Sequence, residues 1–316
     1  MHYVDGSDGL KEPLYHPVVT VGNFDGLHVG HRAIIDTVVE RARNLGGEAV
    51  VYTFEPHPRK VLQPHRAPRL LTSIEQRVEL LEQTGIDVVI VEPFTPEFAK
   101  TPAEVFIREI LHEKIRPVEL YVGYDFHFGR DREGSMQLLT EMGPKLGFSV
   151  TIIPEVTVDA GDVNSTRIRQ MLFEGRVEEA FAMLGRSYTI RGRVVEGDRR
   201  GRDIGFPTAN LDPENEILPA SGVYAGRLRF LDDGDPSRGV EKLVVTNVGV
   251  RPTFGGERRL IAESHLVDFD ADIYGRRVEL SFTHHLRDER RFSGVAALRK
   301  QIAKDVEEGR RRLEAL

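Results

Sequence analysis

The chain has 316 residues, of which 40% are hydrophobic and 29% charged, a composition typical of a folded protein long enough for two domains. It has no cysteine, which excludes disulfides, thiolate metal sites and cysteine nucleophiles, and its net charge of −7 argues against nucleic acid as a partner. Because no apolar run reaches a membrane-spanning length and the start is polar and acidic, we expect a cytoplasmic protein without membrane contact.

Residues 1–186 alternate strand-like and helix-like segments, which predicts a mostly parallel sheet covered by helices on both faces. The expected strands cover 18–22, 49–54, 87–91, 119–124 and 149–153. The expected helices cover 31–43, 74–83, 103–113, 135–146, 166–173 and 177–184. In such a sheet, ligands bind at the carboxyl ends of the strands.

A glycine-rich loop follows the first expected strand and leads into the first expected helix. Glycines let the backbone approach a ligand closely, and the free N–H groups at a helix start attract phosphate. His28 and His31 lie three residues apart, so a helical turn places them on one face. The loop therefore predicts a phosphate site at which both histidines reach the same group.

Three further motifs follow other expected strands. They are Thr-Phe-Glu-Pro-His-Pro with His57, Gly-Tyr-Asp-Phe-His-Phe-Gly with Asp125, Phe126 and Phe128, and Asn-Ser-Thr-Arg-Ile-Arg with Ser165, Thr166 and Arg169. Hydroxyl and guanidinium groups at a helix start suit phosphate oxygens. Each motif alone is equally compatible with a turn, a loop carboxylate or a helix cap.

Together these motifs resemble the nucleotidyltransferase superfamily, and Gly-Asn-Phe-Asp-Gly-Leu-His-Val-Gly-His (22–31) is similar to its FMN adenylyltransferase branch. The resemblance implies a Rossmann-like α/β/α domain that transfers AMP from ATP to FMN and releases pyrophosphate, with His28 and His31 as catalytic residues. It implies ATP binding by Gly22, Asn23, Phe24, Asp25, Gly26, His28, His31, Ser165, Thr166 and Arg169. It implies FMN binding by His57, Asp125, Phe126 and Phe128.

After Gly185 about six short strand-like stretches occur without intervening helices, which predicts a six-stranded antiparallel β-barrel followed by a C-terminal helix. These stretches cover 188–196, 206–211, 223–230, 242–249, 262–269 and 277–283. Ser293 is the expected N-cap of the helix, whose apolar face is expected to consist of Leu298, Ile302, Val306 and Leu313. We therefore expect domains at 1–186 and 187–316.

The second half carries a glycine- and arginine-rich loop followed by Pro-Thr-Ala-Asn (207–210). Thr208 and Asn210 alternate on one strand face, so both oxygens can address one Mg²⁺ ion or phosphate group. This region resembles the riboflavin kinase family, whose reaction must remove a proton from an alcohol. The resemblance implies ATP and Mg²⁺ binding by Gly197, Gly201, Arg202, Thr208 and Asn210, with Thr208 and Asn210 as metal ligands.

The same resemblance implies that Glu263 is the catalytic base, with Glu279 and Asp268 as the nearest alternatives. It also implies riboflavin binding by Glu263, Arg287 and Phe292. The order of the two modules resembles the bifunctional riboflavin kinase/FAD synthetase family, whose small-molecule partners are riboflavin, FMN, FAD and ATP. Two alternatives stay open: a two-domain nucleotidyltransferase that acts on another phosphate acceptor and has a barrel that only binds, and a flavin-binding regulator without activity. The sequence leaves the oligomeric state open.

Overall fold

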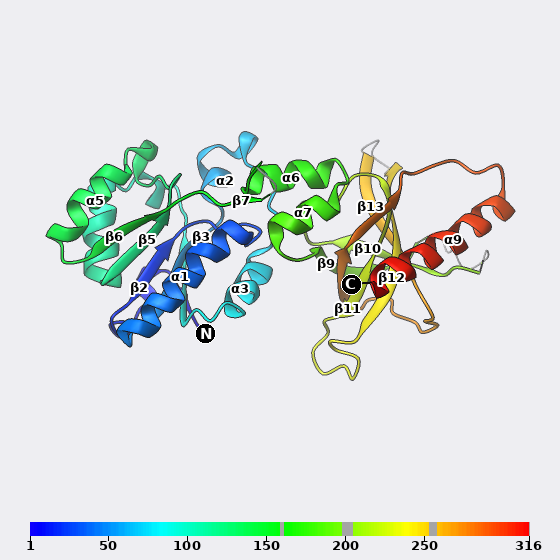
Figure 1. Cartoon of the computed structure of the whole chain (residues 1–316), viewed down its shortest axis with the longest axis horizontal. Helices are drawn as coiled ribbons and strands as arrows, with labels where there is room; N and C mark the ends of the chain where they lie inside the picture. The colour runs from blue at the N-terminus through cyan, green and yellow to red at the C-terminus, as the bar shows by residue number, and fades with distance from the viewer. Residues whose placement is uncertain (159–160, 198–204, 253–257, 316) are drawn as a thin grey trace. The chain divides into compact units, whose positions relative to one another are not determined.

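The computed structural model describes residues 1–158, 161–197, 205–252 and 258–315 (Figure 1). It contains two compact units, Met1–Asn164 and Ser165–Leu316. By their contacts, the helices at 165–173 and 177–184 group with the second unit. The domain boundary near residue 186 stays a prediction.

The first unit is built on a six-stranded parallel sheet with the strand order β1-β4-β3-β2-β5-β6. The expected parallel sheet is confirmed, with one additional edge strand at the N-terminus. Its strands are β1 (His2–Asp5), β2 (Val18–Val21), β3 (Ala49–Glu55), β4 (Val88–Pro93), β5 (Glu119–Gly123) and β6 (Ser149–Ile153). A separate two-stranded hairpin consists of β7 (Thr157–Val158) and β8 (Gly161–Asp162).

Helices cover both faces of this sheet (Figure 1). They are α1 (Val29–Leu45), α2 (Pro58–Leu62), α3 (Ile74–Glu82), α4 (Ala103–Val105), the π-helix η4 (Phe106–Ile115) that continues α4, and α5 (Met136–Lys145). Short 3-10 turns lie at η1 (Ser7–Gly9), η2 (Pro64–Arg66), η3 (Phe98–Lys100) and η5 (Arg130–Arg132).

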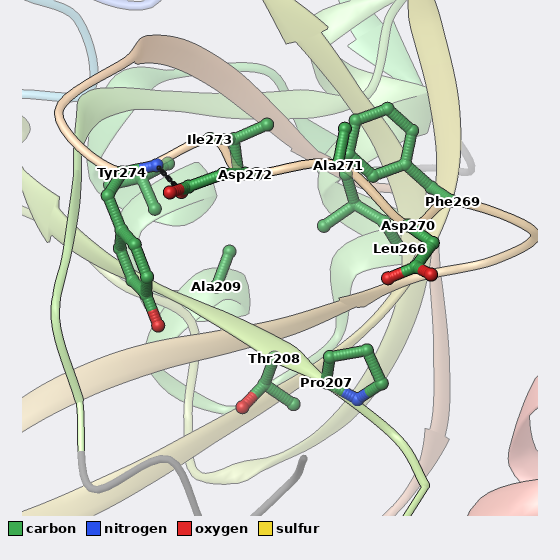
Figure 2. Close-up of a pocket in the computed structure, with 11 residues that line it drawn as sticks. Pro207, Thr208, Ala209, Leu266, Phe269, Asp270, Ala271, Asp272, Ile273 and Tyr274 are labelled. Carbon is green, nitrogen blue, oxygen red and sulfur yellow. Dashed lines mark hydrogen bonds between the residues drawn. The ribbon is translucent and has the colours of Figure 1, made fainter.

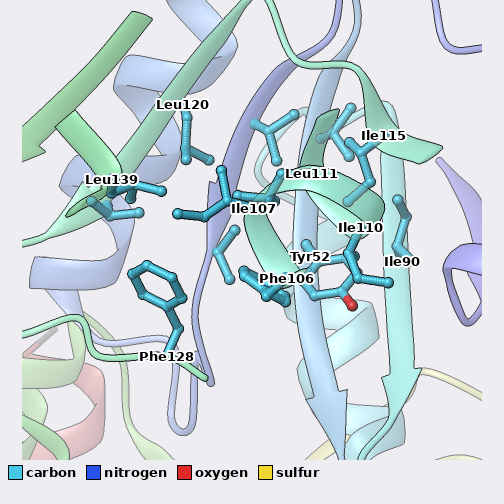
Figure 3. Packing of buried hydrophobic residues seen from close by; sticks show 14 of the residues in the cluster. Tyr52, Ile90, Phe106, Ile107, Ile110, Leu111, Ile115, Leu120, Phe128 and Leu139 are labelled. Atoms are coloured by element: carbon cyan, nitrogen blue, oxygen red, sulfur yellow. The ribbon is translucent and has the colours of Figure 1, made fainter. Parts of the chain in front are cut away.

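Alternate residues of the central strands point to opposite faces and build two cores. On one face, Val51 and Val89 pack with Ile35 of α1 and Leu81 of α3. On the other face, residues of η4 and α5 pack against the sheet around Tyr52, as Figure 3 shows. Because the central strands are buried on both sides, the carboxyl edge of the sheet is rigidly supported.

The second unit begins with α6 (Ser165–Phe173) and α7 (Val177–Leu184) and continues into an antiparallel barrel. The strands are β9 (Tyr188–Val195), β10 (Thr208–Pro213), β11 (Gly222–Phe230), β12 (Glu241–Pro252), β13 (Arg258–Leu266), β14 (Arg277–Phe282) and β15 (His284–Arg287). Six of them run in the order β12-β13-β10-β9-β14-β11, and pairing of β11 with β12 closes the ring. The predicted six-stranded barrel is confirmed, and the short strand β15 pairs with β11 in addition.

The C-terminal helix α9 (Val295–Glu314) packs against β11, β12 and β15. Its N-cap is Gly294 rather than the expected Ser293, and no side chain caps it. Gly309 allows a close approach, because a Cβ atom there would lie 3.2 Å from both Ala225 Cβ and Val245 Cγ2. The helix therefore lies tightly on the barrel wall.

Candidate functional sites

The first candidate site lies where the strand order of the parallel sheet reverses. The chain runs outward from β2 to β3 and β4, then returns to place β5 on the other side of β2. The loops that leave neighbouring strands in opposite directions open a crevice at such a point. The glycine loop follows β2 and the Asp125 loop follows β5, so the sheet brings both predicted motifs to this switch point.

His28 and His31 lie side by side at the start of α1. His28 is the N-cap, and its Nδ1 accepts a hydrogen bond of 3.2 Å from the His31 backbone N–H. The two rings stack with centroids 3.5 Å apart, and the edge of Phe24 packs against His31. Because Nδ1 of His28 accepts a bond, the proton of the neutral ring sits on Nε2. The predicted juxtaposition of the two histidines is therefore present in the fold.

The loop around these histidines is held in an uncommon backbone conformation. Phe24, Gly26 and Leu27 all have positive φ, and a Cβ atom on Gly26 would lie only 2.6 Å from Leu71 Cδ1. Gly30 lies against the ring of His28, where a Cβ atom would be 3.2 Å from Nδ1. Gly26 is thus required by both its positive φ and its close packing, whereas Gly30 is favoured by close packing alone.

Asp25 is buried, and its carboxylate holds the loop to the segment before α3. It accepts hydrogen bonds from the backbone N–H groups of Leu71 and Thr72 at 3.0 and 3.1 Å. The Thr72 hydroxyl in turn accepts from the Gly26 N–H. These contacts give Asp25 a structural task, and its predicted contact with ATP stays a prediction.

The predicted flavin-side residues lie after β3 and β5. His57 is buried and caps α2, with Nδ1 accepting from the Arg59 N–H at 3.1 Å. Asp125 is exposed, whereas Phe126 and Phe128 stack with centroids 5.5 Å apart. Phe128 belongs to the hydrophobic core, which leaves Phe126 the more accessible ring.

Ser165 and Thr166 open α6, and Arg169 lies one turn further along the same helix. Ser165 and Arg169 are half-buried, and Thr166 is exposed. These three residues belong to the second compact unit. Their contact with ATP stays a prediction.

The second candidate site is a polar row across three neighbouring barrel strands. Asn210 on β10 stands opposite Glu263 on β13, which stands opposite Asn247 on β12. Residues directly opposite each other point to the same face, with Cβ atoms about 5 Å apart. Thr208 lies two residues before Asn210 and shares this face. The barrel thus brings together the predicted base and both predicted metal ligands.

Gly197 lies in close contact with Asn210 of this polar row. A Cβ atom at residue 197 would lie 2.0 Å from Asn210 Nδ2, so no side chain fits while Asn210 keeps its place. Asn210 is buried, and its Oδ1 has no hydrogen-bond partner among the described residues. Gly201 and Arg202, which the sequence also assigns to this site, lie outside the described residues.

A cavity of about 230 Å³ opens beside the row, and Figure 2 shows its lining. Pro207 and Thr208 form one side, and the segment from Phe269 to Tyr274 forms the other. The carboxylate of Asp272 accepts from the Tyr274 N–H at 3.0 Å. The cavity combines apolar side chains such as Phe269 and Ile273 with polar groups such as Thr208 and Asp272, as small-molecule sites do.

The two alternative bases, Glu279 and Asp268, form ion pairs with arginines. Glu279 accepts hydrogen bonds from Arg191 at 2.8 Å and from Arg229 at 2.6 Å, and it is largely buried. Asp268 is exposed and pairs with Arg310 at 2.6 Å. Neither has the half-buried place beside Asn210 that Glu263 has, so the geometry favours Glu263.

The predicted riboflavin-binding residues Arg287 and Phe292 lie close together. The Arg287 guanidinium lies 5.7 Å from the centre of the Phe292 ring. It also binds the buried carboxylate of Asp305 on α9, with the shortest contact at 2.8 Å. Arg287 therefore anchors α9 to β15, and its contact with riboflavin stays a prediction.

Two polar residues of this site carry no role in the sequence prediction. Asn247 completes the polar row, and the signal that could have found it is its polar side chain in an otherwise apolar strand segment. His265 has Nδ1 2.9 Å from the Pro207 carbonyl and thereby supports the Pro-Thr-Ala-Asn strand. That contact joins residues 58 positions apart, so no local pattern reveals it.

Comparisons with known proteins match each half of the chain to a family. The FAD synthetase family model matches residues 11–167, and the riboflavin kinase family model matches residues 184–313. A bifunctional riboflavin kinase/FMN adenylyltransferase from Escherichia coli is 38% identical over 96% of each chain. The protein of the same name from Haemophilus influenzae is 37% identical over 97% of each chain.

A solved structure from Streptococcus pneumoniae, named as a macrolide-efflux protein, has a TM-score of 0.87 and 29% identity. The match covers 98% of this chain and 99% of that one, so the two share their architecture throughout. No helix among the described residues is long and apolar enough to cross a membrane. The two family models and the full-length curated relatives agree, and the chain belongs to the bifunctional riboflavin kinase/FMN adenylyltransferase family.

Proposed function

We propose that each matched region performs one of two successive reactions. The riboflavin kinase region phosphorylates riboflavin with ATP to give FMN. The FAD synthetase region then transfers AMP from ATP to FMN, giving FAD and pyrophosphate. Both reactions use ATP, which supports a cytoplasmic location.

For AMP transfer, the FMN phosphate attacks the α-phosphorus of ATP, and the bond to pyrophosphate breaks. The attacking phosphate is already ionised at neutral pH, so the reaction needs no general base. It needs donors aimed at the charge on the α-phosphate and on the leaving pyrophosphate. The Nε2–H of His28, the ring of His31 and the first N–H groups of α1 supply such donors at one place.

For riboflavin phosphorylation, the ribityl 5′-hydroxyl attacks the γ-phosphorus of ATP, and ADP leaves. The hydroxyl proton must go to a base, and the Glu263 carboxylate accepts it in our proposal. Glu263 stands beside Asn210 and Asn247, whose amides can hold the hydroxyl and phosphate oxygens in line. The half-buried position of Glu263 keeps it within reach of substrate.

The cavity beside Thr208 suits the base of ATP. Phe269, Ile273 and Tyr274 offer apolar surface for a purine ring. Asp270 and Asp272 would repel phosphate, so the triphosphate points away from them, past Thr208 toward Asn210. This orientation places the γ-phosphate near Glu263.

The residues of this row also fit a magnesium ion. Asn210 Oδ1 is buried without a hydrogen-bond partner among the described residues, and oxygen is the ligand type that Mg²⁺ prefers. Thr208 would contribute its hydroxyl from the same strand face. When bound, the ion neutralises charge on the ATP phosphates.

The observation that carries the kinase assignment is the alignment of Asn210, Glu263 and Asn247, together with Thr208 on the same strand face, which lines the cavity. The test incubates the protein with riboflavin, ATP and Mg²⁺ and separates the flavins by chromatography. We expect FMN to appear first and FAD later. FMN without FAD would contradict the proposed adenylyl transfer to FMN. Neither product would contradict both proposed reactions and leave the two alternatives, a nucleotidyltransferase with another acceptor and a flavin-binding regulator.

A further inference from the structure

Arg77 is a fully buried charged side chain in the first unit, with 1% of its surface exposed. It projects from α3 and is the only charged residue among the largest fully buried side chains described. Taking a guanidinium out of water is costly, and apolar replacements of buried ion pairs are often tolerated. Stability alone is therefore a weak reason for an arginine at this place.

The guanidinium instead joins the carboxyl ends of two neighbouring strands. Its Nη1 donates to the Asn23 carbonyl at 3.0 Å, in the loop after β2. The same nitrogen donates to the Phe54 carbonyl at 3.1 Å, and Nη2 donates to the Glu55 carboxylate at 2.8 Å, both at the end of β3. The Thr53 hydroxyl accepts a further bond at 3.3 Å.

These contacts lie between the two groups of residues predicted to hold the two substrates. Asn23 belongs to the loop that leads to His28, and Glu55 precedes His57 by two residues. Asp25 ties the same loop to the residues just before α3. Arg77 therefore ties the loop to α3 and to the end of β3, and Asp25 ties it to the residues before α3. The Thr53 hydroxyl adds one longer bond, donated to the Asn23 carbonyl at 3.4 Å.

We propose that Arg77 is a positioning residue for adenylyl transfer, setting the distance between the ATP loop at 22–28 and the FMN-side turn at 55–57. This inference rests on the proposed reaction of the first unit. The rigid fork of an arginine can bind both strand ends at once, whereas a lysine offers a single nitrogen. Without the guanidinium, the distance between the two bound substrates is no longer fixed, although each substrate can still bind.

The test compares Arg77→Lys and the double variant Arg77→Met/Glu55→Gln with wild type. The double variant leaves no unpaired buried charge, so it separates positioning from ion-pair stability. We expect both proteins to melt near the wild-type temperature and to phosphorylate riboflavin normally. We expect kcat for FAD formation to fall by about tenfold or more, with KM for ATP and FMN changed by less than about threefold.

Arg43→Lys is the matched control, because Arg43 also donates through two nitrogens in the same unit, to Asp87 at 2.9 Å and to the Gly85 carbonyl at 3.0 Å, at the opposite end of the strands from the loop. It should keep the wild-type kcat. If wild type makes no FAD from FMN, the proposed function fails. If wild type makes FAD and Arg77→Lys or the folded double variant matches its kcat, the positioning role is refuted. If kcat falls only in step with the folded fraction, Arg77 is structural and the proposal is equally refuted.

Discussion

At the scale of single residues, the proposed kinase site requires a glycine at position 197. Gly197 passes so close to Asn210 that even a methyl group would displace the Asn210 amide. In our proposal that amide holds Mg²⁺ and the ATP phosphates beside Glu263. The spacing of these groups therefore depends on residue 197 as well as on the residues that touch substrate.

We predict that Gly197→Ala lowers kcat for riboflavin phosphorylation by about 100-fold, because a shift of about 1 Å in a catalytic group costs this much. FAD formation from FMN should not change. Gly294→Ala is a suitable control, because a Cβ atom there meets no other atom within 4 Å. Steady-state assays measure kcat for both reactions in each variant. Normal kinase activity of Gly197→Ala would show that this contact does not determine the position of Asn210.

The residue scale also shows where sequence reasoning reaches its limit. The motif containing Asp25 and His28 could be read directly, because its residues are adjacent in the chain. The partners of Asp25, at positions 71 and 72, could not. A motif marks a residue as part of a site, but its long-range hydrogen bonds decide whether it touches the ligand or holds the loop.

At the scale of elements, α9 is attached to the barrel by a buried ion pair on its packed face. The sequence predicts an apolar face with Leu298, Ile302, Val306 and Leu313. Leu313 is buried as expected. Asp305 is buried as well, and its carboxylate accepts hydrogen bonds from the Arg287 guanidinium. A purely apolar pattern cannot reveal such a pair, since a carboxylate on a helix normally marks the solvent side.

We predict that Asp305→Asn lowers the free energy of unfolding by about 1–3 kcal/mol, because a charged hydrogen bond to Arg287 becomes a neutral one. If Arg287 and Phe292 shape the riboflavin site, KM for riboflavin should rise while KM for ATP stays constant. Urea unfolding and kinase assays measure the two effects. The exposed pair of Arg311 with Glu308 provides the control, since Arg311→Ala should change stability by less than about 1 kcal/mol. Equal effects of both variants would contradict the anchoring role of Asp305.

A second ion pair fixes α1, the helix that carries the histidines, to β5. Arg41 donates to Glu119 at 2.6 and 3.0 Å, and these hydrogen bonds hold the pKa of Glu119 below its usual value of 4.5. Because the folded-state pKa is the lower one, the pair stabilises the fold above about pH 4.5. This contribution is lost as the pH falls through the folded-state pKa.

We therefore predict that Glu119→Gln lowers Tm by roughly 2 °C at pH 7 and that this difference shrinks as the pH falls below 4.5. Thermal unfolding of both proteins from pH 7 to pH 3 measures it. A difference that stays constant or grows toward pH 3 would be inconsistent with a lowered pKa.

The elements that the sequence did not predict are those with weak hydrophobic patterns. The edge strand β1 buries only Val4, so its four residues show no clear alternation. The strand β15 has four half-buried residues, two of them histidines. The central strands and α1 were predictable because their apolar residues repeat with the period of a strand or helix. The hydrophobic pattern is weak where a strand such as β1 or β15 is held by hydrogen bonds to a neighbouring strand and buries few apolar side chains of its own.

At the scale of the whole molecule, the chain carries two sites with different chemical needs. In our proposal, the first holds phosphates already ionised and requires donors, which His28, His31 and the start of α1 would provide. The second must remove a proton from an alcohol and requires a carboxylate, which Glu263 beside Asn210 would provide. Since neither set can perform the other task, the two activities should be separable by single substitutions.

The most direct test assays Glu263→Gln and His28→Ala, each with riboflavin plus ATP and, separately, with FMN plus ATP. Glu263→Gln should form no FMN from riboflavin yet convert FMN to FAD at the wild-type rate. His28→Ala should form FMN normally and lose FAD formation by about 100-fold or more. The assignment of one reaction to each site would be contradicted if either folded variant lost both reactions. It would also be contradicted if Glu263→Gln still phosphorylated riboflavin or if His28→Ala still formed FAD at the wild-type rate.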